Sequence, residues 1–216
     1  MMKKAEIIER MGRERVVGIL RTDTAEQAVL ASRAMVEAGM ACIEITWTVP
    51  GAGEALTQLS GEYPDALWGA GSITTPERCR EALAAGAQFI VAPNFDPRVV
   101  GMTLEAGKVS CPGVITPTEM VAAHQAGADV LKVFPINCLG GVAYLKAVRG
   151  PLPDYRFCPT GGIDKDTLKG YLDAGAFCAG AGGNLVPMKE VRAGNYDAVV
   201  QNTREFIAAR DAAVGR

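Results

Sequence analysis

The sequence predicts an α/β protein, folded as a single-domain (β/α)8 TIM barrel with an N-terminal capping helix. Short apolar runs, typical of buried parallel strands, alternate with longer helical segments, and about eight such units fit into the 216 residues. Four helical segments end in a glycine that supplies the left-handed turn into the next apolar run: Gly39, Gly86, Gly127 and Gly175. No linker-like break interrupts this pattern, so we expect one domain spanning residues 1–216.

The elements follow in chain order from a charged N-terminal segment, residues 1–15. Ile7, Ile8 and Met11 fall at helical spacing there, which predicts a short amphipathic helix over one end of the domain and no signal peptide. Eight strands are expected, at residues 16–20, 42–46, 67–71, 89–92, 108–112, 130–134, 156–158 and 177–179. Helix starts are marked by capping residues, at Thr24, Thr75, Asp96, Thr116 and Asp164.

Composition and charge exclude several classes of function. The net charge is −2 and no basic stripe is present, so neither nucleic acid nor a membrane surface is an expected partner. No run reaches the roughly 18 apolar residues that a membrane span needs. Cys42, Cys158 and Cys178 lie in apolar runs without C-x-x-C spacing, which indicates buried thiols and a cytoplasmic location. The single histidine, His124, is expected at the surface, so no metal and no cofactor is expected.

Lys132 is the most informative residue, because it lies within the apolar run 128–135. Burial disfavours the charged ammonium, and a neutral amine is a nucleophile that forms a Schiff base with a ketone. The protonated Schiff base then withdraws electrons from a neighbouring C–C bond. The alternative is a lysine at the solvent end of its strand, salt-bridged or extended toward water.

Glu44 is the carboxylate that accompanies this lysine, within the apolar run 42–46. Burial raises the pKa of such a carboxyl group into the range that a proton shuttle needs. Because both residues lie in strands of one predicted barrel, we expect them to face the same interior. A structural ion pair between Lys132 and Glu44 is the alternative.

Glycine-rich runs follow the last two predicted strands, at Gly161 and Gly162 and at Gly182 and Gly183. In a barrel of this kind the chemistry lies at the C-terminal ends of the strands, and phosphate is commonly bound after strands seven and eight. Tight turns are the alternative explanation. Arg21, at the end of the first strand, either contacts a substrate carboxylate or pairs with Asp23.

The spacing of several motifs resembles the 2-keto-3-deoxy-6-phosphogluconate (KDPG) and 4-hydroxy-2-oxoglutarate aldolase family. The resemblance extends from Val16 to about Tyr196. Its motifs are Glu44-Ile45-Thr46, Gly69-Ala70-Gly71-Ser72-Ile73, Ala92-Pro93-Asn94, Lys132-Val133-Phe134-Pro135 and the run 156–163.

This resemblance implies a class I aldolase on a (β/α)8 barrel that forms a homotrimer and releases pyruvate. Lys132 is then the Schiff-base lysine and Glu44 the acid/base, and the substrate is a small keto acid. The main reaction that we expect is cleavage of KDPG to pyruvate and glyceraldehyde 3-phosphate. Substrate contacts are expected from Arg21, Thr46, Thr48, Ser72, Pro93 and Phe134, and phosphate contacts from Thr160, Gly161, Gly162, Gly182 and Gly183.

The chain departs from the KDPG aldolase pattern at three positions. Thr48 stands where the family has an arginine, Asn94 replaces a usual glycine, and Gly183 with Asn184 replaces a usual serine. Several features resemble the sister 2-keto-3-deoxy-6-phosphogalactonate (KDPGal) aldolases: Ile19-Leu20-Arg21, Pro93-Asn94, the absent arginine with a nearby proline, and Ala179-Gly180-Ala181-Gly182. Cleavage of KDPGal or 4-hydroxy-2-oxoglutarate, or oxaloacetate decarboxylation, by the same lysine are therefore alternatives. From other classes, a phosphate-barrel isomerase and a catalytically silent binding barrel stay open.

Overall fold

The computed structural model describes residues 2–215, and these residues fold as an α/β protein whose strand pairs are all parallel. Six strands form one sheet in the order β5-β4-β3-β2-β1-β9, and three form a second in the order β6-β7-β8. The strands are β1 (Val16–Leu20), β2 (Cys42–Thr46), β3 (Leu67–Gly71), β4 (Phe89–Val91), β5 (Val109–Cys111), β6 (Gly113–Val114), β7 (Leu131–Val133), β8 (Phe157–Pro159) and β9 (Ala179–Ala181).

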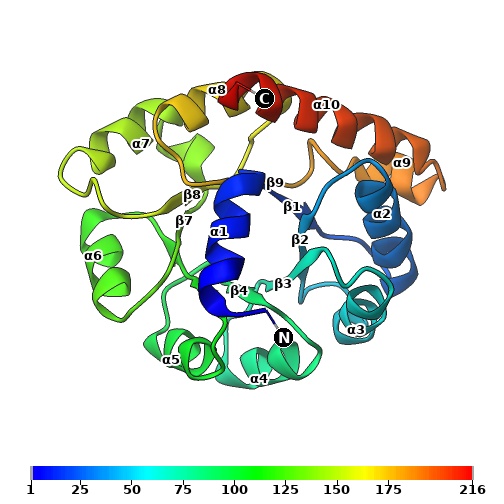
Figure 1. The fold of residues 1–216 in the computed structure, drawn as a ribbon, viewed down its shortest axis with the longest axis horizontal. Helices are drawn as coiled ribbons and strands as arrows, with labels where there is room; N and C mark the ends of the chain where they lie inside the picture. The colour runs from blue at the N-terminus through cyan, green and yellow to red at the C-terminus, as the bar shows by residue number, and fades with distance from the viewer. Residues whose placement is uncertain (1, 216) are drawn as a thin grey trace.

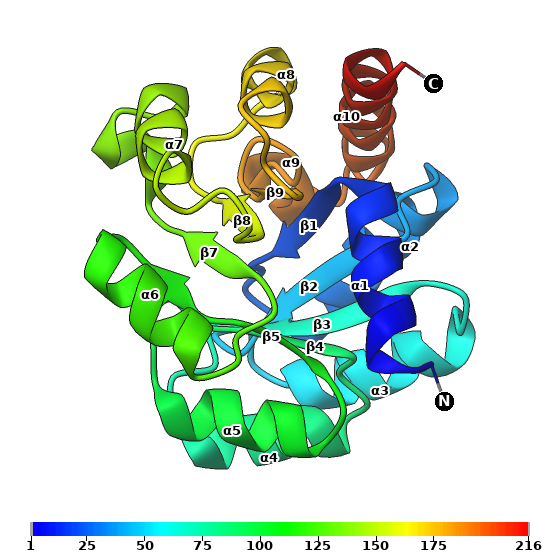
Figure 2. The ribbon, with the colours of Figure 1, turned by 60° about the vertical axis from the view of Figure 1, so that its left-hand side comes forward.

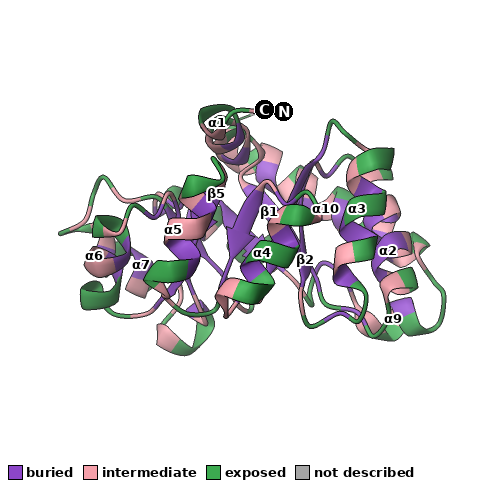
Figure 3. Ribbon diagram, turned by 90° about the horizontal axis from the view of Figure 1, so that it is seen from below, coloured by how far each residue is buried: buried purple, intermediate pink, exposed green. Residues whose placement is uncertain are grey.

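Most of the helices surround the strands on the outside of the molecule (Figure 1, Figure 2). They are α1 (Lys4–Glu14), α2 (Ala25–Glu37), α3 (Ala52–Glu62), α4 (Pro76–Ala84), α5 (Pro97–Glu105), α6 (Pro117–Gln125), the 3₁₀ turn η1 (Ile136–Leu139), α7 (Val142–Arg149), α8 (Lys165–Asp173), α9 (Met188–Arg192) and α10 (Asp197–Val214). The strands are buried throughout, whereas the helices expose their outer faces (Figure 3). Burial on both faces explains why the strands read as continuous apolar runs.

Two backbone contacts connect the strands of the two sheets. Thr160, directly after β8, forms a parallel bridge with Gly180 of β9. On the other side, the N–H of Lys132 in β7 donates to the carbonyl of Pro112, 2.9 Å away, between β5 and β6. The residue directly after β8 thus pairs with β9, and the residue directly after β5 is hydrogen-bonded to β7.

The predicted signals at the helix ends are confirmed. Each of the predicted start residues is an N-cap whose side chain accepts a backbone N–H: Thr24, Thr75, Asp96, Thr116 and Asp164. Each of the four predicted helix-ending glycines has a positive φ, between 86° and 99°: Gly39, Gly86, Gly127 and Gly175. The start of helix α3 had no capping residue to mark it in the sequence, because its N-cap is Gly51, which has no side chain.

Two predicted strands were wrong in their extent. The strand expected at 108–112 ends at Cys111, because Pro112 has no N–H to donate, and a second short strand that was not predicted, β6, follows at Gly113–Val114. Gly113 then packs so closely on the Pro93 backbone that a Cβ would lie 2.2 Å from the Pro93 carbonyl carbon. The strand expected at 177–179 begins two residues later, at Ala179, whose N–H donates to the Arg15 carbonyl. The other strand ends differ from the prediction by at most one residue.

Helix α1 forms where the amphipathic pattern predicts it and lies across the strands in Figure 1. Ile7 and Met11 are buried in a cluster that includes Val17, Leu67 and Phe89 from three different strands. Within residues 2–215, the helices are too short or too polar to cross a membrane.

The cysteines and the histidine lie largely where the sequence places them. Cys42, Cys158 and Cys178 are free, buried thiols, as predicted, whereas Cys138 is exposed. His124 is at the surface, as predicted, and its ring stacks on Tyr155 with centroids 4.0 Å apart.

Candidate active site

Lys132 and Glu44 lie side by side in the interior, one from each sheet. Lys132 is the middle residue of β7 and Glu44 the middle residue of β2. Lys132 Nζ lies 3.9 Å from Glu44 Oε1, and only 7% of Lys132 and 2% of Glu44 are exposed. Lys132 Nζ also lies 5.3 Å from the ring centroid of Phe134. An amine and a carboxyl group thus meet in a largely apolar surrounding.

The contact between these two groups is not a closed, hydrogen-bonded salt bridge. At 3.9 Å the atoms are beyond hydrogen-bond distance, and Glu44 Oε1 is buried without a hydrogen-bond partner in the described structure. Burial raises the pKa of Glu44 above its ordinary 4.5, while the positive charges of Lys132 and Arg21 oppose this rise. Burial thus has the larger effect on this carboxyl group, and the charges of Lys132 and Arg21 offset only part of it.

A cavity of about 370 Å³ has Lys132 in its lining. It is bounded by β1, β7, β8 and β9 and by the loops that follow them. The residues that line it are Ile19, Arg21, Lys132, Phe134, Thr160, Gly161, Gly162, Ile163, Gly180, Gly182, Gly183, Asn184, Val186 and Met188. It has the size of a small-molecule site, and it brings together eight of the residues that the sequence proposed.

The two glycine loops form part of the wall of this cavity. Among residues 2–215, the N–H groups of Gly162, Gly182 and Gly183 donate to no acceptor. The Asn184 side-chain amide donates to the Ile163 carbonyl at 3.1 Å and so joins the two loops. Unpaired backbone N–H groups beside a cavity are donors for an anion such as phosphate.

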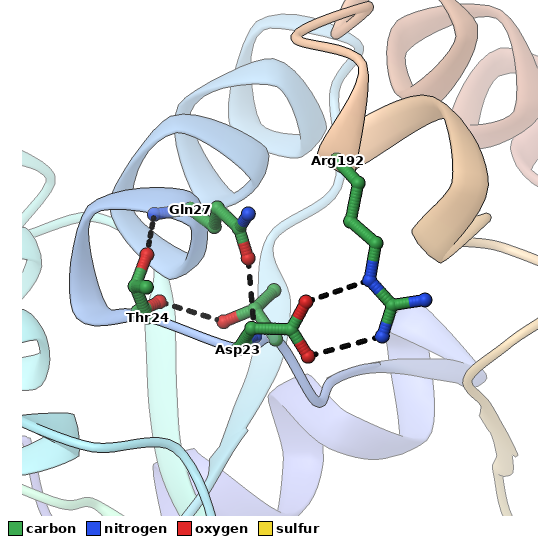
Figure 4. Close-up of polar contacts among 5 residues, drawn as sticks. Asp23, Thr24, Gln27 and Arg192 are labelled. Atoms are coloured by element: carbon green, nitrogen blue, oxygen red, sulfur yellow. Dashed lines mark hydrogen bonds and ion pairs between the residues drawn. The ribbon is translucent and has the colours of Figure 1, made fainter.

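Arg21 lines the cavity and forms no ion pair with Asp23. Asp23 instead accepts two hydrogen bonds from Arg192, from Nε at 2.7 Å and from Nη2 at 3.1 Å (Figure 4). Arg21 itself makes no hydrogen bond or ion pair with any residue between 2 and 215. The sequence left two explanations open for Arg21, a contact with the substrate carboxylate or a pair with Asp23. The structure shows no pair with Asp23, so the Arg21 side chain is available to a ligand.

Four of the expected substrate contacts lie outside the cavity lining: Thr46, Thr48, Ser72 and Pro93. Thr46 is buried and shares a 2.9 Å hydrogen bond with the exposed Thr48. Ser72 directly follows β3 and has a left-handed backbone, with φ of 59°, which is unusual for a residue other than glycine. Their role in substrate binding stays a prediction.

The apolar side of the cavity was not predicted from the sequence. Val186 and Met188 line it from the segment that leads into α9, and Ile19 and Ile163 complete it. In the sequence, the only indication that Val186 and Met188 line the cavity was that they follow the second glycine run.

The comparisons with known proteins agree with this geometry. The family model "Aldolase: KDPG and KHG aldolase" matches residues 7–202. The chain is 38% identical over 201 residues to the 2-dehydro-3-deoxy-phosphogluconate aldolase of Treponema pallidum (strain Nichols), covering 93% of this chain and 96% of the relative.

Two solved structures are similar over nearly the whole chain. A native KDPGal structure has a TM-score of 0.86 and 30% identity, covering 93% of this chain and 96% of its own. The KDPG aldolase of Legionella pneumophila, with pyruvate captured as a covalent carbinolamine intermediate, has a TM-score of 0.85 and 28% identity, covering 92% and 96%. By its sequence match over residues 7–202, this chain belongs to the KDPG and KHG aldolase family.

Proposed function

We propose that the protein is a class I aldolase that cleaves a 2-keto-3-deoxy-6-phospho sugar acid, with KDPG as the preferred substrate. The products are pyruvate and glyceraldehyde 3-phosphate. The observation that carries this proposal is the contact of the Lys132 amine with the Glu44 carboxyl group, 3.9 Å apart beside a 370 Å³ cavity. The carbinolamine of the Legionella pneumophila relative supports covalent chemistry with pyruvate.

The reaction begins when the Lys132 amine attacks the C2 ketone of the substrate. The protonated Glu44 gives its proton to the carbinolamine hydroxyl group, directly or through water, and water leaves to form the iminium. Glu44 then takes the proton of the C4 hydroxyl group. The C3–C4 bond breaks, its electrons enter the iminium, and the aldehyde leaves. The remaining enamine is protonated at C3 and hydrolysed to pyruvate, so the chemistry requires no metal or cofactor.

The cavity supplies different contacts for the two ends of such a substrate. We assign the substrate carboxylate to Arg21, which would replace the arginine that the family has in the position of Thr48. Pro93, Phe134, Ser72 and the hydroxyl groups of Thr46 and Thr48 would surround the pyruvyl half. The phosphate would lie on the glycine loops, held by Thr160, Gly161, Gly162, Gly182 and Gly183. The unpaired N–H groups of Gly162, Gly182 and Gly183 support this assignment.

We further propose that the two sheets form one (β/α)8 barrel, in a single domain spanning residues 1–216. The Thr160–Gly180 bridge and the bond from Lys132 to Pro112 support closure, with β5 and β6 as two parts of one strand. Helix α1 would cap the N-terminal end of this barrel, which the burial of Ile7 and Met11 supports.

The family resemblance also leads us to propose a homotrimer. Light scattering during size-exclusion chromatography tests this assembly, since a mass near three chains of 22.7 kDa is expected. The five buried free thiols support a reducing, cytoplasmic location.

A coupled assay of pyruvate release tests the proposed function. Lactate dehydrogenase and NADH report pyruvate from KDPG, KDPGal, 4-hydroxy-2-oxoglutarate and oxaloacetate, each over a range of concentrations. We expect the highest kcat/KM with KDPG and no turnover of any of them by Lys132→Ala. Preference for KDPGal would match the similarity to the KDPGal structure and the threonine at position 48. Turnover retained in Lys132→Ala would contradict the proposal.

A further inference from the structure

Arg21 is a cation beside the cavity, and no carboxylate within residues 2–215 forms an ion pair with it. It is exposed, it lines the cavity together with Lys132, and within residues 2–215 it has no hydrogen-bond or ion-pair partner. Its charge reaches the interior, because it lowers the pKa of Glu44 against the effect of burial. An unpaired guanidinium group in this place is suited to hold an anionic group of a ligand.

The carboxylate closest to Arg21 along the chain, that of Asp23, is fully engaged elsewhere. Both of its oxygens accept from Arg192, which binds through two parallel N–H groups at 2.7 and 3.1 Å (Figure 4). The same arginine lowers the pKa of Asp23, so Asp23 carries a negative charge at neutral pH. Arg192 ends helix α9, whose first residue, Met188, also lines the cavity.

Two further hydrogen bonds connect residues of the short loop between β1 and α2. The Thr22 hydroxyl donates to the Thr24 carbonyl at 2.9 Å, and the Asp23 N–H donates to the Gln27 side chain at 3.1 Å (Figure 4). Arg21 and Asp23 are only two residues apart in this loop. Without Arg192, the cation nearest to the charged Asp23 along the chain would be Arg21, and an ion pair between them would compete with a ligand.

We propose that Arg192 is a positioning residue that occupies Asp23 and thereby keeps Arg21 free for the anionic group of the substrate. This inference rests on the proposed function, in which Arg21 contacts the keto acid. It assigns a role in substrate affinity to a residue outside the cavity. The role is a competition between two cations for one carboxylate, and not merely the attachment of α9 to the β1 loop.

A cycle of three variants separates these two roles. If Arg192 acts by occupying Asp23, Arg192→Gln releases a carboxylate that attracts Arg21, and KM rises about fivefold or more with little change in kcat. Asp23→Asn removes the competing charge and leaves KM close to that of the wild type. The double variant Asp23→Asn with Arg192→Gln then restores KM, although the contact between the loops is still absent.

A purely structural contact predicts the opposite pattern. All three variants would then raise KM by the same factor, because each removes the same pair of hydrogen bonds. That pattern, or an unchanged KM in Arg192→Gln, would overturn the proposal. Arg33→Gln is the matched control: it removes another two-bonded arginine–carboxylate pair, from helix α2 to Glu62, at 3.0 and 2.7 Å. Its KM is expected to stay unchanged.

Two ligands distinguish which anionic group Arg21 holds. Half-saturation by pyruvate, measured from the rate of borohydride trapping, reports the carboxylate alone, and KM for KDPG reports both ends. If Arg192→Gln raises both the half-saturating concentration of pyruvate and KM for KDPG, Arg21 holds the carboxylate. If it raises only KM for KDPG, Arg21 holds the phosphate. If the wild type forms no pyruvate adduct, the proposed function fails. If it forms one and the variants show equal effects, only the inference about Arg192 fails.

Discussion

The carboxyl group of Glu44 occupies the space that a side chain on Gly71 would fill. A Cβ at Gly71 would lie 1.7 Å from Glu44 Oε1, closer than any non-bonded contact. Gly71 ends β3, and β3 is paired in register with β2, which carries Glu44. The glycine on one strand thus allows the carboxyl group on its neighbour to lie beside Lys132.

Gly71→Ala is therefore expected to displace the Glu44 carboxyl group and to lower kcat. The loss is expected to approach that of a missing acid/base, roughly 10²-fold or more. Gly61→Ala is the control, because a methyl group added at Gly61 in α3 would meet nothing within 4 Å and the variant should keep full activity. Steady-state kinetics of both variants, with circular dichroism to verify folding, test this relationship. Equal activity of the two would show that the position of Glu44 does not depend on Gly71.

Glu44→Gln is expected to lower kcat and to change how stability depends on pH. Because burial raises the pKa of Glu44 in the folded state, the folded state binds a proton more tightly than the unfolded state does. The contribution of Glu44 to stability is complete below its ordinary pKa of 4.5 and is lost as pH rises through the raised pKa.

The amide of Glu44→Gln does not ionise, so this variant should gain stability relative to the wild type as pH rises above about 4.5. Thermal unfolding of both proteins between acidic and neutral pH measures the difference. If the stability of Glu44→Gln relative to the wild type falls or stays constant as pH rises, the raised pKa is contradicted.

Arg21→Gln is expected to weaken binding of the keto acid. Loss of one charge-assisted contact corresponds to about 1.5–3 kcal/mol, or roughly a 10- to 150-fold higher half-saturating concentration of pyruvate. Arg21→Lys should recover part of this affinity, since it keeps the charge without the paired N–H groups of arginine. Concentration-dependent borohydride trapping provides the measurement. If Arg21→Gln binds pyruvate like the wild type, Arg21 does not hold the carboxylate.

Gly162→Ala is expected to weaken binding of the phosphorylated substrate and not of pyruvate. Gly162 has φ of 69°, and a Cβ there would lie 3.0 Å from Asn137 Cβ, so the substitution shifts the loop that offers its N–H group.

Gly107→Ala is the matched control for this variant. Gly107 has φ of 67°, and a Cβ there would meet nothing within 4 Å, so it bears the same backbone strain away from the cavity. KM for KDPG should rise only in Gly162→Ala, and an equal rise in both variants would place the phosphate elsewhere.

Much of the site was predictable because each part of it has a local signal. Lys132 and Glu44 stand out as charged residues in apolar strands, and parallel strands bring the middles of such runs into one interior. The helix ends were predictable for the same reason, since Thr24 and Gly39 act within a single turn of their own helix.

The remaining features depend on contacts between distant segments. Asp23 and Arg192 are 169 residues apart, and nothing in either local sequence indicates that they pair. Val186 and Met188 enter the cavity because the chain turns after the glycine run into the short helix α9. The close approach of the Pro93 backbone to Gly113, beside the break between β5 and β6, likewise joins segments that are distant in the sequence.

The Schiff base at Lys132 is the central claim, and borohydride trapping with pyruvate tests it most directly. The protein is incubated with pyruvate and sodium borohydride and then analysed by intact and peptide mass spectrometry. We predict one reduced pyruvyl adduct per chain, on the peptide that contains Lys132, and no adduct in Lys132→Arg. An unmodified wild-type protein, or an adduct on another lysine, would contradict the claim.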